Sequence, residues 1–307
     1  MRIGLPGGGS SADRIVQQAI DAEADGFTSL WFASAVFGDP LVPMAMAGKA
    51  TSTIELGTSV LQTYTCHPVL QANRAAATAA AMERPGFTLG IGPSHHVVIE
   101  DMFGLSYQGA GSHTEEYVDV LAPLLRGEGV DHSGQHFRVK IPAVNPPVQP
   151  VSVMLSALGP RLLRVAGEST AGTILWMANA RAVDVHVAPK INAAAAAAGR
   201  PQPRIVAGLP VAVHDDVAEA RQKAAKDFAN YGVLPNYRRI LDIGGAAGPA
   251  EAAIVGDEAS VAEQIQSLFD AGATDVWAAP FAVGDDRSAS RLRTRALLKE
   301  LAASGPS

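Results

Sequence analysis

Short apolar runs alternate along the chain with longer amphipathic runs, beginning with residues 2–5 and then 12–24. A short apolar run between small or polar residues predicts a buried strand, whereas apolar residues repeated every three or four positions predict a helix. Further strands are predicted at 29–32, 54–61, 87–91, 151–156, 173–176, 205–213 and 275–279. Further helices are predicted at 41–52, 68–82, 114–125, 161–169, 183–198, 217–231 and 288–302.

Strands alternating with helices predict an α/β fold, the closed (β/α)8 TIM barrel. Parallel strands need crossover connections, and the fixed handedness of those connections leaves few other arrangements. An open, doubly wound sheet is the alternative. A chain of 307 residues suits one such barrel, so we expect a single domain over residues 1–307.

Two segments interrupt the alternation and are expected to be excursions from the barrel. Residues 127–150 contain GVDHSGQHFRV followed by the proline-rich IPAVNPPVQP, which predicts a small hairpin and a stiff connector. Residues 234–257 are rich in Gly and Ala, which predicts a mobile surface segment near a barrel mouth, where a lid could form.

Charge and cysteine content narrow the possible functions. The formal net charge of -6 argues against a nucleic-acid-binding protein, since such proteins carry a basic face. Cys66 is the only cysteine, so no internal disulfide can form and a reducing cytoplasm is the expected location. The histidines show no metal-ligand spacing, so we predict no metal site. Without a signal peptide or a run of about 18 apolar residues, we expect neither export nor a membrane-spanning protein.

Candidate chemistry gathers in residues 87–107, FTLGIGPSHHVVIEDMFGLSY. An apolar strand ends there in Gly-Pro-Ser, and His95 and His96 follow directly. Active sites of TIM barrels lie at the carboxyl ends of the strands, and a histidine can exchange a proton near neutral pH. Neighbouring side chains on a helix point in different directions, so at most one histidine should face the site, and we favour His95. The alternative is that both only hydrogen-bond the loop or cap the next helix.

A family resemblance rests on six phrases and on their order along the chain. They are ADGFTSLWFAS, IELGTSVLQTYTCHPVLQANRAA, FTLGIGPSHH, GSHTEEYVDVLAPLLRGEGVDHSGQHFRV, PVSVMLSALGPRLLRVAGESTAGTILWMAN and VGDEASVAEQIQSLFDAGATDVWAAP. Together they resemble the luciferase-like monooxygenase superfamily over essentially the full chain. The phrases LGIGPSH and SALGPRLLRVAGE resemble its coenzyme F420-dependent oxidoreductase branch. The resemblance implies a barrel that binds a flavin-like ring as hydride carrier, and a homodimer.

The resemblance also implies where the cofactor is held. In that family a bulge with a non-prolyl cis peptide supports the ring at the end of the third strand, and this position falls on Ser59-Val60. The turn that begins at Ser156 leads into a helix, whose free N–H groups attract the phosphate that the family's cofactor carries. The alternatives are an ordinary strand end and an ordinary β-to-α turn. The expected cofactor contacts are Thr58, Ser59, Val60, Gly92, Ser94, Ala157, Leu158, Gly159 and Trp176.

Departures from the family bear on the chemistry. His95 and His96 stand near the position where several F420-dependent relatives carry an acidic residue, so either could protonate a substrate as hydride arrives. Relatives that oxidise sugars or alcohols place an Asp-His pair where this chain has Ser34-Ala35. Loss of that base argues against alcohol oxidation and favours reduction of an activated double bond or carbonyl. The candidate catalytic residues are His95, His96 and Ser34.

The sequence therefore predicts a coenzyme F420-dependent oxidoreductase that transfers a hydride between the deazaflavin and a small organic substrate. An FMN-dependent luciferase-like monooxygenase is one alternative, and a non-catalytic flavin-binding barrel is the other. No GxGxxG phrase follows a strand, so a nicotinamide partner would bind weakly or not at all.

Overall fold

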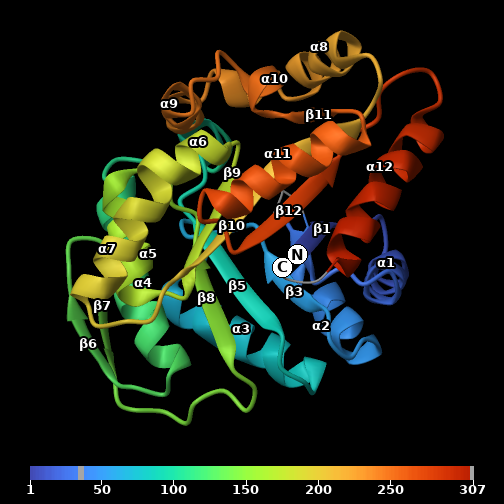
Figure 1. Cartoon of the computed structure of the whole chain (residues 1–307). Coiled ribbons are helices and arrows are strands. Elements are labelled where there is room, and N and C mark those ends of the chain that lie inside the picture. The colour runs from blue at the N-terminus through green and yellow to red at the C-terminus, as the bar shows by residue number, and fades with distance from the viewer. Residues whose placement is uncertain (34–37, 305–307) are drawn as a thin grey trace.

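The predicted strands pair in parallel and close into a barrel. The computed structural model describes residues 1–33 and 38–304. In ring order the strands are β1 Ile3–Gly7, β2 Ser29–Phe32, β3 Glu55–Thr58, β5 Phe87–Gly92, β8 Val151–Leu155, β9 Gly172–Trp176, β10 Arg204–Val213 and β12 Asp275–Pro280. Pairing of β9 with β10 and of β12 with β1 completes the ring. The predicted TIM barrel is confirmed (Figure 1).

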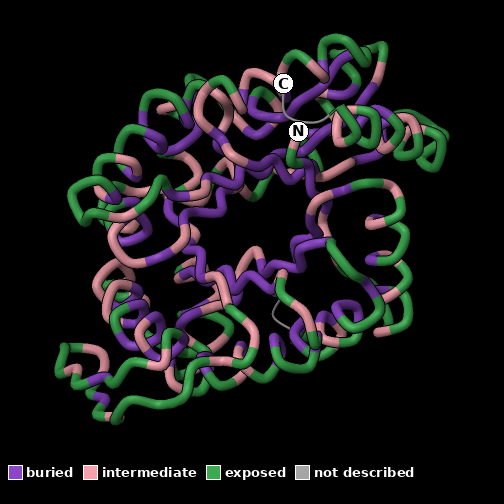
Figure 2. Tube along the Cα trace, turned by 60° about the horizontal axis from the view of Figure 1, so that its bottom comes forward, coloured by how far each residue is buried: buried purple, intermediate pink, exposed green. Residues whose placement is uncertain are grey.

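Helices surround the barrel, and their outward faces are exposed whereas the ring of strands is buried (Figure 2). They include α1 Ala12–Ala24, α2 Leu41–Ala50, α3 Pro68–Met82, α4 Ala110–Leu125, α5 Pro160–Ser169, α7 Ala188–Ala197, α8 Val217–Asp227, α11 Glu258–Asp270 and α12 Arg287–Ala303. Side-chain caps explain several starts: Ser11 accepts from the Arg14 N–H at 3.3 Å and Asp257 from the Ser260 N–H at 2.8 Å.

Several predicted helices have different ends in the structure: α4, for example, begins at Ala110 instead of 114. Helix α11 is not among the predicted helices. The helix expected over 183–198 starts earlier, as α6 Ala180–Ala182 and the π-helical turn η2 Val183–Val187, because the Asn179 side chain caps the N–H of Ala182. The helix expected over 217–231 ends with α8, and the 3-10 turn η3 Ala229–Gly232 follows. Between them Phe228 packs its ring against Trp176 and Phe281 instead of continuing the helix.

The strand predicted over 54–61 is broken by a bulge. It forms β3 and then β4 Leu61–Gln62, which pairs with β5. The peptide bond between Ser59 and Val60 is cis, as the family resemblance implied. The backbones of β3 and β5 lie close together here, because a Cβ atom on Gly90 would lie 1.9 Å from the Thr58 carbonyl oxygen.

Both interruptions of the alternation are visible as separate pieces of structure. Strands β6 Val130–Ser133 and β7 Arg138–Ile141 form the predicted hairpin. The segment expected to be a mobile surface segment contains α9 Pro235–Ile243, α10 Pro249–Ala252 and β11 Ile254–Gly256, which pairs with β10. Pro235 occupies the first turn of α9, where its missing N–H costs nothing, and Ile240 and Leu241 bury the inner side of that helix.

Large aromatic side chains fill the inside of the barrel where glycines leave space. A Cβ on Gly57 would lie 2.3 Å from the Trp31 ring, and one on Gly208 would lie 1.9 Å from Nε1 of Trp277. Both indole N–H groups are hydrogen-bonded, that of Trp31 to the Ser29 hydroxyl at 2.9 Å and that of Trp277 to a backbone carbonyl at 3.1 Å. These two indoles therefore pack inside the barrel with their N–H groups satisfied, as a buried Trp requires.

A network of charges closes the barrel at the amino ends of its strands. Arg204 binds Glu55 at 2.8 Å and Asp275 at 2.7 Å, and Arg2 binds the same two carboxylates at 3.0 and 2.6 Å. The Thr88 hydroxyl donates to Glu55 at 2.5 Å. Burial alone would raise the pKa of Asp275, but the hydrogen bond and charge of Arg204 and the charge of Arg2 lower it overall.

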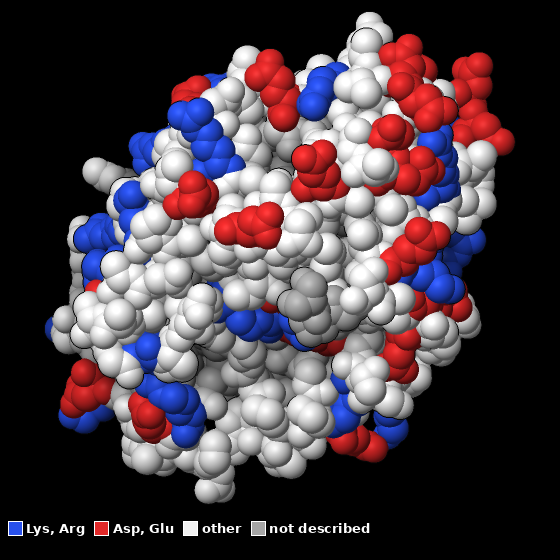
Figure 3. Space-filling model, in the orientation of Figure 1, with Lys and Arg blue, Asp and Glu red and all other residues white. Residues whose placement is uncertain are grey.

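The surface carries charged side chains of both signs. Basic and acidic side chains are interspersed over the face seen in Figure 3, without a large area of one sign. Among the residues that the structure describes, no helix combines the length and apolarity needed to cross a lipid bilayer.

We expect Asp275→Asn to lower the free energy of unfolding by about 3 kcal/mol, because it removes the charge of one of the two carboxylates that bind Arg204 and Arg2. Urea unfolding followed by far-UV circular dichroism measures this loss. The matched control is Asp131→Asn, since the pair of Asp131 with Lys140 is 71% and 82% exposed and such pairs contribute about 0–1 kcal/mol. Equal losses in both variants would contradict the role assigned to the network.

The difference in free energy of unfolding between wild type and Asp275→Asn should also depend on pH. Because the folded-state pKa of Asp275 is lowered, its contribution is complete above the unfolded-state pKa of about 3.9 and is lost as pH falls through the folded-state value. Unfolding curves at about pH 7 and about pH 3 should show the difference shrinking at the lower pH. A difference that stays constant would mean that the carboxylate charge does not stabilise the fold.

Candidate active site at the carboxyl ends of the strands

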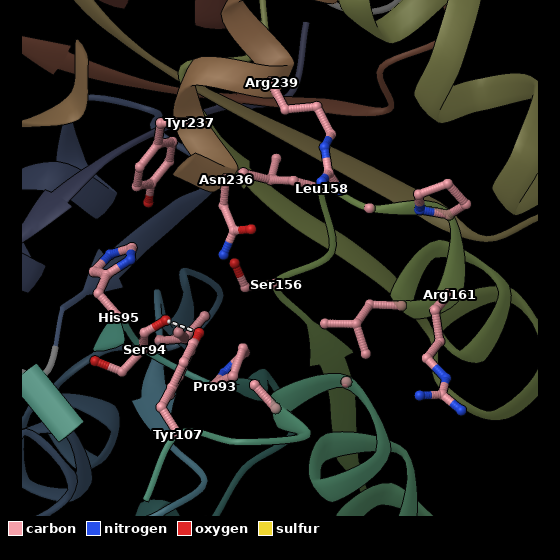
Figure 4. A pocket seen from close by; sticks show the side chains of 17 residues that line it. Pro93, Ser94, His95, Tyr107, Ser156, Leu158, Arg161, Asn236, Tyr237 and Arg239 are labelled. Carbon is pink, nitrogen blue, oxygen red and sulfur yellow. Dashed lines mark hydrogen bonds between the residues drawn. The ribbon is translucent and has the colours of Figure 1, made fainter. Parts of the chain in front are cut away.

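A cavity of about 310 Å³ lies at the carboxyl ends of β4, β5 and β8. It is lined by the turns that follow β5 and β8, by Tyr107 and the start of α4, and by side chains of α9 (Figure 4). This is the end of the barrel where TIM-barrel enzymes keep their active sites, and the volume falls in the lower part of the range for small-molecule sites.

The structure separates the predicted site residues into three groups. Those that line the cavity are Val60, Gly92, Ser94, His95, Leu158 and Gly159. Those that lie outside the lining are Thr58, Ser59, His96, Ala157 and Trp176. Ser34 belongs to neither group, because it lies outside the described residues.

The turn after β5 has a tight and unusual backbone. A Cβ on Gly92 would lie 2.9 Å from Cγ2 of Val60 and 3.0 Å from Cβ of Ser156, so a glycine is needed where these three residues meet. Ser94 has φ of 62°, a left-handed conformation that is uncommon without glycine. Its carbonyl accepts a hydrogen bond of 2.7 Å from the Tyr107 hydroxyl (Figure 4).

Only one of the two adjacent histidines lines the cavity. His95 is half-buried there, and its ring lies 5.4 Å from that of Tyr237 of α9. Burial lowers the pKa of His95, and the neighbouring His96 adds to the effect. His96 is exposed and precedes the π-helix η1 Val97–Met102, without making a side-chain cap. A neutral imidazole at His95 can therefore exchange one proton with a molecule in the cavity.

The turn between β8 and α5 presents donors to the cavity. Gly159 is the extended N-cap residue of α5 and offers no side chain to cap the helix, while Pro160 occupies its first turn. Two arginines flank the turn: Arg161 pairs with Glu115 at 3.1 Å, and Nη1 of Arg239 lies 3.7 Å from where a Cβ on Gly159 would be.

The charge of the cavity lining is positive. Within the described part of the chain, no hydrogen bond or ion pair occupies the guanidinium of Arg239, and the described lining contains no Asp or Glu. An unopposed guanidinium beside a helix N-terminus favours a ligand with an anionic group such as phosphate.

Three of the predicted residues outside the lining pack or hydrogen-bond within the barrel instead. The Thr58 hydroxyl donates to the Gly90 carbonyl at 2.7 Å and accepts from the Gly90 N–H at 2.8 Å. Ala157 is fully buried, and its N–H donates to the Thr173 hydroxyl at 3.3 Å. Trp176 stacks on Trp277 with ring centroids 4.8 Å apart, which is the packing role that large aromatic residues usually have.

Sequence reasoning missed several lining residues, chiefly Tyr107, Asn236, Tyr237 and Arg239. Tyr107 ends the segment already singled out for its histidines, but nothing in its spacing marks it. The other three belong to α9, inside the segment considered for a lid. The helix-start proline and the adjacent Ile240 and Leu241 were the available signal for α9, yet they do not reveal that the helix covers the cavity.

Over residues 1–33 and 38–304, no group of three or more His, Cys, Asp or Glu side chains is placed to hold a metal ion.

Comparisons with known proteins agree with this geometry. The sequence matches the family described as luciferase-like monooxygenase over residues 2–298. An F420-dependent hydroxymycolic acid dehydrogenase of Mycobacterium tuberculosis is 29% identical over 228 residues, which are 68% of this chain and 61% of the relative.

Solved structures share the fold at low identity. A coenzyme F420-dependent tetrahydromethanopterin reductase from Methanopyrus kandleri has a TM-score of 0.72 at 21% identity, over 95% of this chain and 96% of the other. The oxygenating constituent of 3,6-diketocamphane monooxygenase from Pseudomonas putida, in complex with FMN, has a TM-score of 0.73 at 18% identity, over 99% and 98%.

We expect Thr58→Val to lower the free energy of unfolding by about 1–3 kcal/mol, because it leaves buried polar groups of Gly90 without their partner. The control is Thr63→Val, since the Thr63 hydroxyl is equally buried but has no partner among the described residues. Removing an unpartnered hydroxyl should be neutral or stabilising. Urea unfolding of both variants measures the two free energies of unfolding. A larger decrease for Thr63→Val than for Thr58→Val would contradict the supporting role of the Thr58 hydroxyl.

Proposed function

The chain belongs to the luciferase-like monooxygenase family, and we propose that it is a coenzyme F420-dependent oxidoreductase. It transfers a hydride between the deazaflavin and a small organic substrate. The observation that carries this proposal is the cavity at the carboxyl ends of the strands, which joins the bulge after β3, a histidine and an unopposed arginine beside a helix start. F420-dependent enzymes among its relatives support the choice of cofactor.

The lining fits such a cofactor. Val60 and Gly92 offer an apolar surface and a side-chain-free backbone for a flat ring. Gly159 and Arg239 offer donors for a phosphate without a competing carboxylate. When bound, the deazaflavin supplies the hydride, and the protein supplies position and electrostatics.

We propose the reductive direction. A carbonyl that receives a hydride develops negative charge on its oxygen, and donors placed in advance stabilise that charge. The lining contains such donors in Tyr237, Asn236 and His95 and no described carboxylate that would act as a base. His95 is the group that exchanges the proton with substrate, because it is the one ionisable group of the β5 turn that lines the cavity.

An FMN-dependent monooxygenase is the second candidate. The observation in its favour is the shared fold with an FMN-containing monooxygenase. FMN also carries a phosphate, so the donors at Gly159 and Arg239 would suit it as well. We further propose, from the family resemblance and the single cysteine, a homodimer in the cytoplasm.

We expect purified protein to bind coenzyme F420 with micromolar affinity, about tenfold or more tighter than FMN, since each tenfold ratio needs only about 1.4 kcal/mol of better contacts. Fluorescence titration with each compound measures both constants. Riboflavin, which lacks the phosphate, is the control and should bind more weakly than FMN. Tighter binding of FMN would favour the monooxygenase, and retention of neither compound would overturn the proposal.

We expect His95→Asn to lower kcat about 100-fold with an acceptor that the wild type reduces, because general acid–base catalysis contributes about 10²–10⁴-fold. His96→Asn is the matched control and should stay near wild type, since that side chain is exposed outside the cavity. The assay follows oxidation of reduced F420 with a panel of carbonyl and activated-alkene acceptors. Equal loss in both variants would remove His95 from its role, and no turnover with any acceptor would favour a non-catalytic barrel.

A further inference from the structure

The backbone that presents His95 to the cavity is held from both sides. Before it, the Ser94 carbonyl accepts the Tyr107 hydroxyl at 2.7 Å. After it, the His95 carbonyl accepts the N–H groups of Val98 and Ile99, both at 3.0 Å, which starts η1. The direction of the imidazole therefore depends on a short stretch of chain fixed at two points.

One of these two points is strained. Ser94 keeps φ of 62°, a conformation that residues other than glycine seldom adopt. Such a conformation persists only where surrounding contacts enforce it. In the described structure the Tyr107 hydroxyl is the side-chain group bonded to the Ser94 carbonyl, so it is the contact that can enforce this turn.

Tyr107 is itself well anchored. Its N–H donates to Oε1 of Glu100 at 3.0 Å. Its ring stacks on Tyr64 at 5.5 Å, and Tyr64 stacks in turn on the buried His113 at 4.0 Å with an interplanar angle of 3°. The backbone N–H and the ring of Tyr107 are thus held by residues that do not line the cavity.

Tyr107 also stays a donor at neutral pH. Burial raises the pKa of Tyr107 to about 12, and the nearby Tyr64 adds to the rise while the Asn236 side chain opposes it. A protonated phenol can keep its hydrogen bond to the Ser94 carbonyl throughout the working pH range of an enzyme.

We propose that Tyr107 is a positioning residue: its hydroxyl holds the Ser94 carbonyl in the left-handed turn and so keeps the His95 imidazole inside the cavity. The structural part of this proposal needs no cofactor. Its kinetic consequence rests on the proposed function, in which His95 exchanges the proton with substrate.

The test is a titration of His95 in wild type and in Tyr107→Phe, by NMR of protein with labelled histidines. The chain has 8 histidines, and the His95 signal is assigned by its absence in His95→Gln. The charged or ionisable groups around the imidazole are His96 beside it, Tyr237 and Arg239 of α9, and Tyr107. In wild type, burial keeps the pKa of His95 below its ordinary value.

In Tyr107→Phe the ring should leave its half-buried position, and the pKa of His95 should rise toward about 6.5, the value of a solvated histidine. The matched control is Tyr64→Phe, which removes a hydroxyl from the stacked neighbour, buried and without a described partner. That variant should leave His95 unchanged. In Tyr107→Phe, His113 should keep its pKa of about 4, which shows that the aromatic stack is still folded.

An unchanged His95 titration in Tyr107→Phe would overturn the proposal, as would equal shifts in the two Phe variants. A kinetic double-mutant cycle tests the consequence separately. Tyr107→Phe should lower kcat in the wild-type background but cause no further loss in the His95→Gln background, because it acts through His95. If the NMR shift occurs while His95→Gln retains full activity, the positioning role stands and the proposed function of His95 fails.

Discussion

Closure of the barrel is the constraint on which the rest of the structure depends. Pairing of β12 with β1 and of β9 with β10 turns a row of parallel strands into a ring. Once the ring is closed, all carboxyl ends meet at one mouth, so turns that are far apart in the sequence become neighbours. Val60, His95 and Gly159 come from turns after neighbouring strands of this ring, since β4 and β8 both pair with β5, and they line one cavity.

The two ends of the barrel are electrostatically different. At the amino ends, Arg204 and Arg2 form ion pairs with Glu55 and Asp275, and these pairs link the strands to one another. At the carboxyl ends, Arg239 has no described partner and the described lining contains no carboxylate. The charges at one end are thus paired within the chain, whereas a guanidinium at the other end faces the cavity, a division that suits a stable scaffold with a binding site.

Excursions from the barrel complete this ligand-facing end. Helix α9 brings Tyr237 against His95 and carries Arg239 over the start of α5. The loop between η1 and α4 brings the Tyr107 hydroxyl within hydrogen-bond distance of the Ser94 carbonyl, and the Tyr107 ring stacks on Tyr64. The ring supplies rigid strand ends, and these later additions determine which of the groups on them face the cavity.

The sequence alone determined the barrel, the hairpin, the bulge after β3 and the histidine-bearing turn, because each depends on local period, on small residues or on phrases shared with a family. Gly92 and Gly159 could be selected for the same reason. The sequence favoured His95 over His96 without fixing the choice, and it could not place Tyr107 or Arg239 at the cavity. Those assignments depend on how distant segments pack and on which way a strained backbone turns, and neither is encoded in the spacing of residues along the chain.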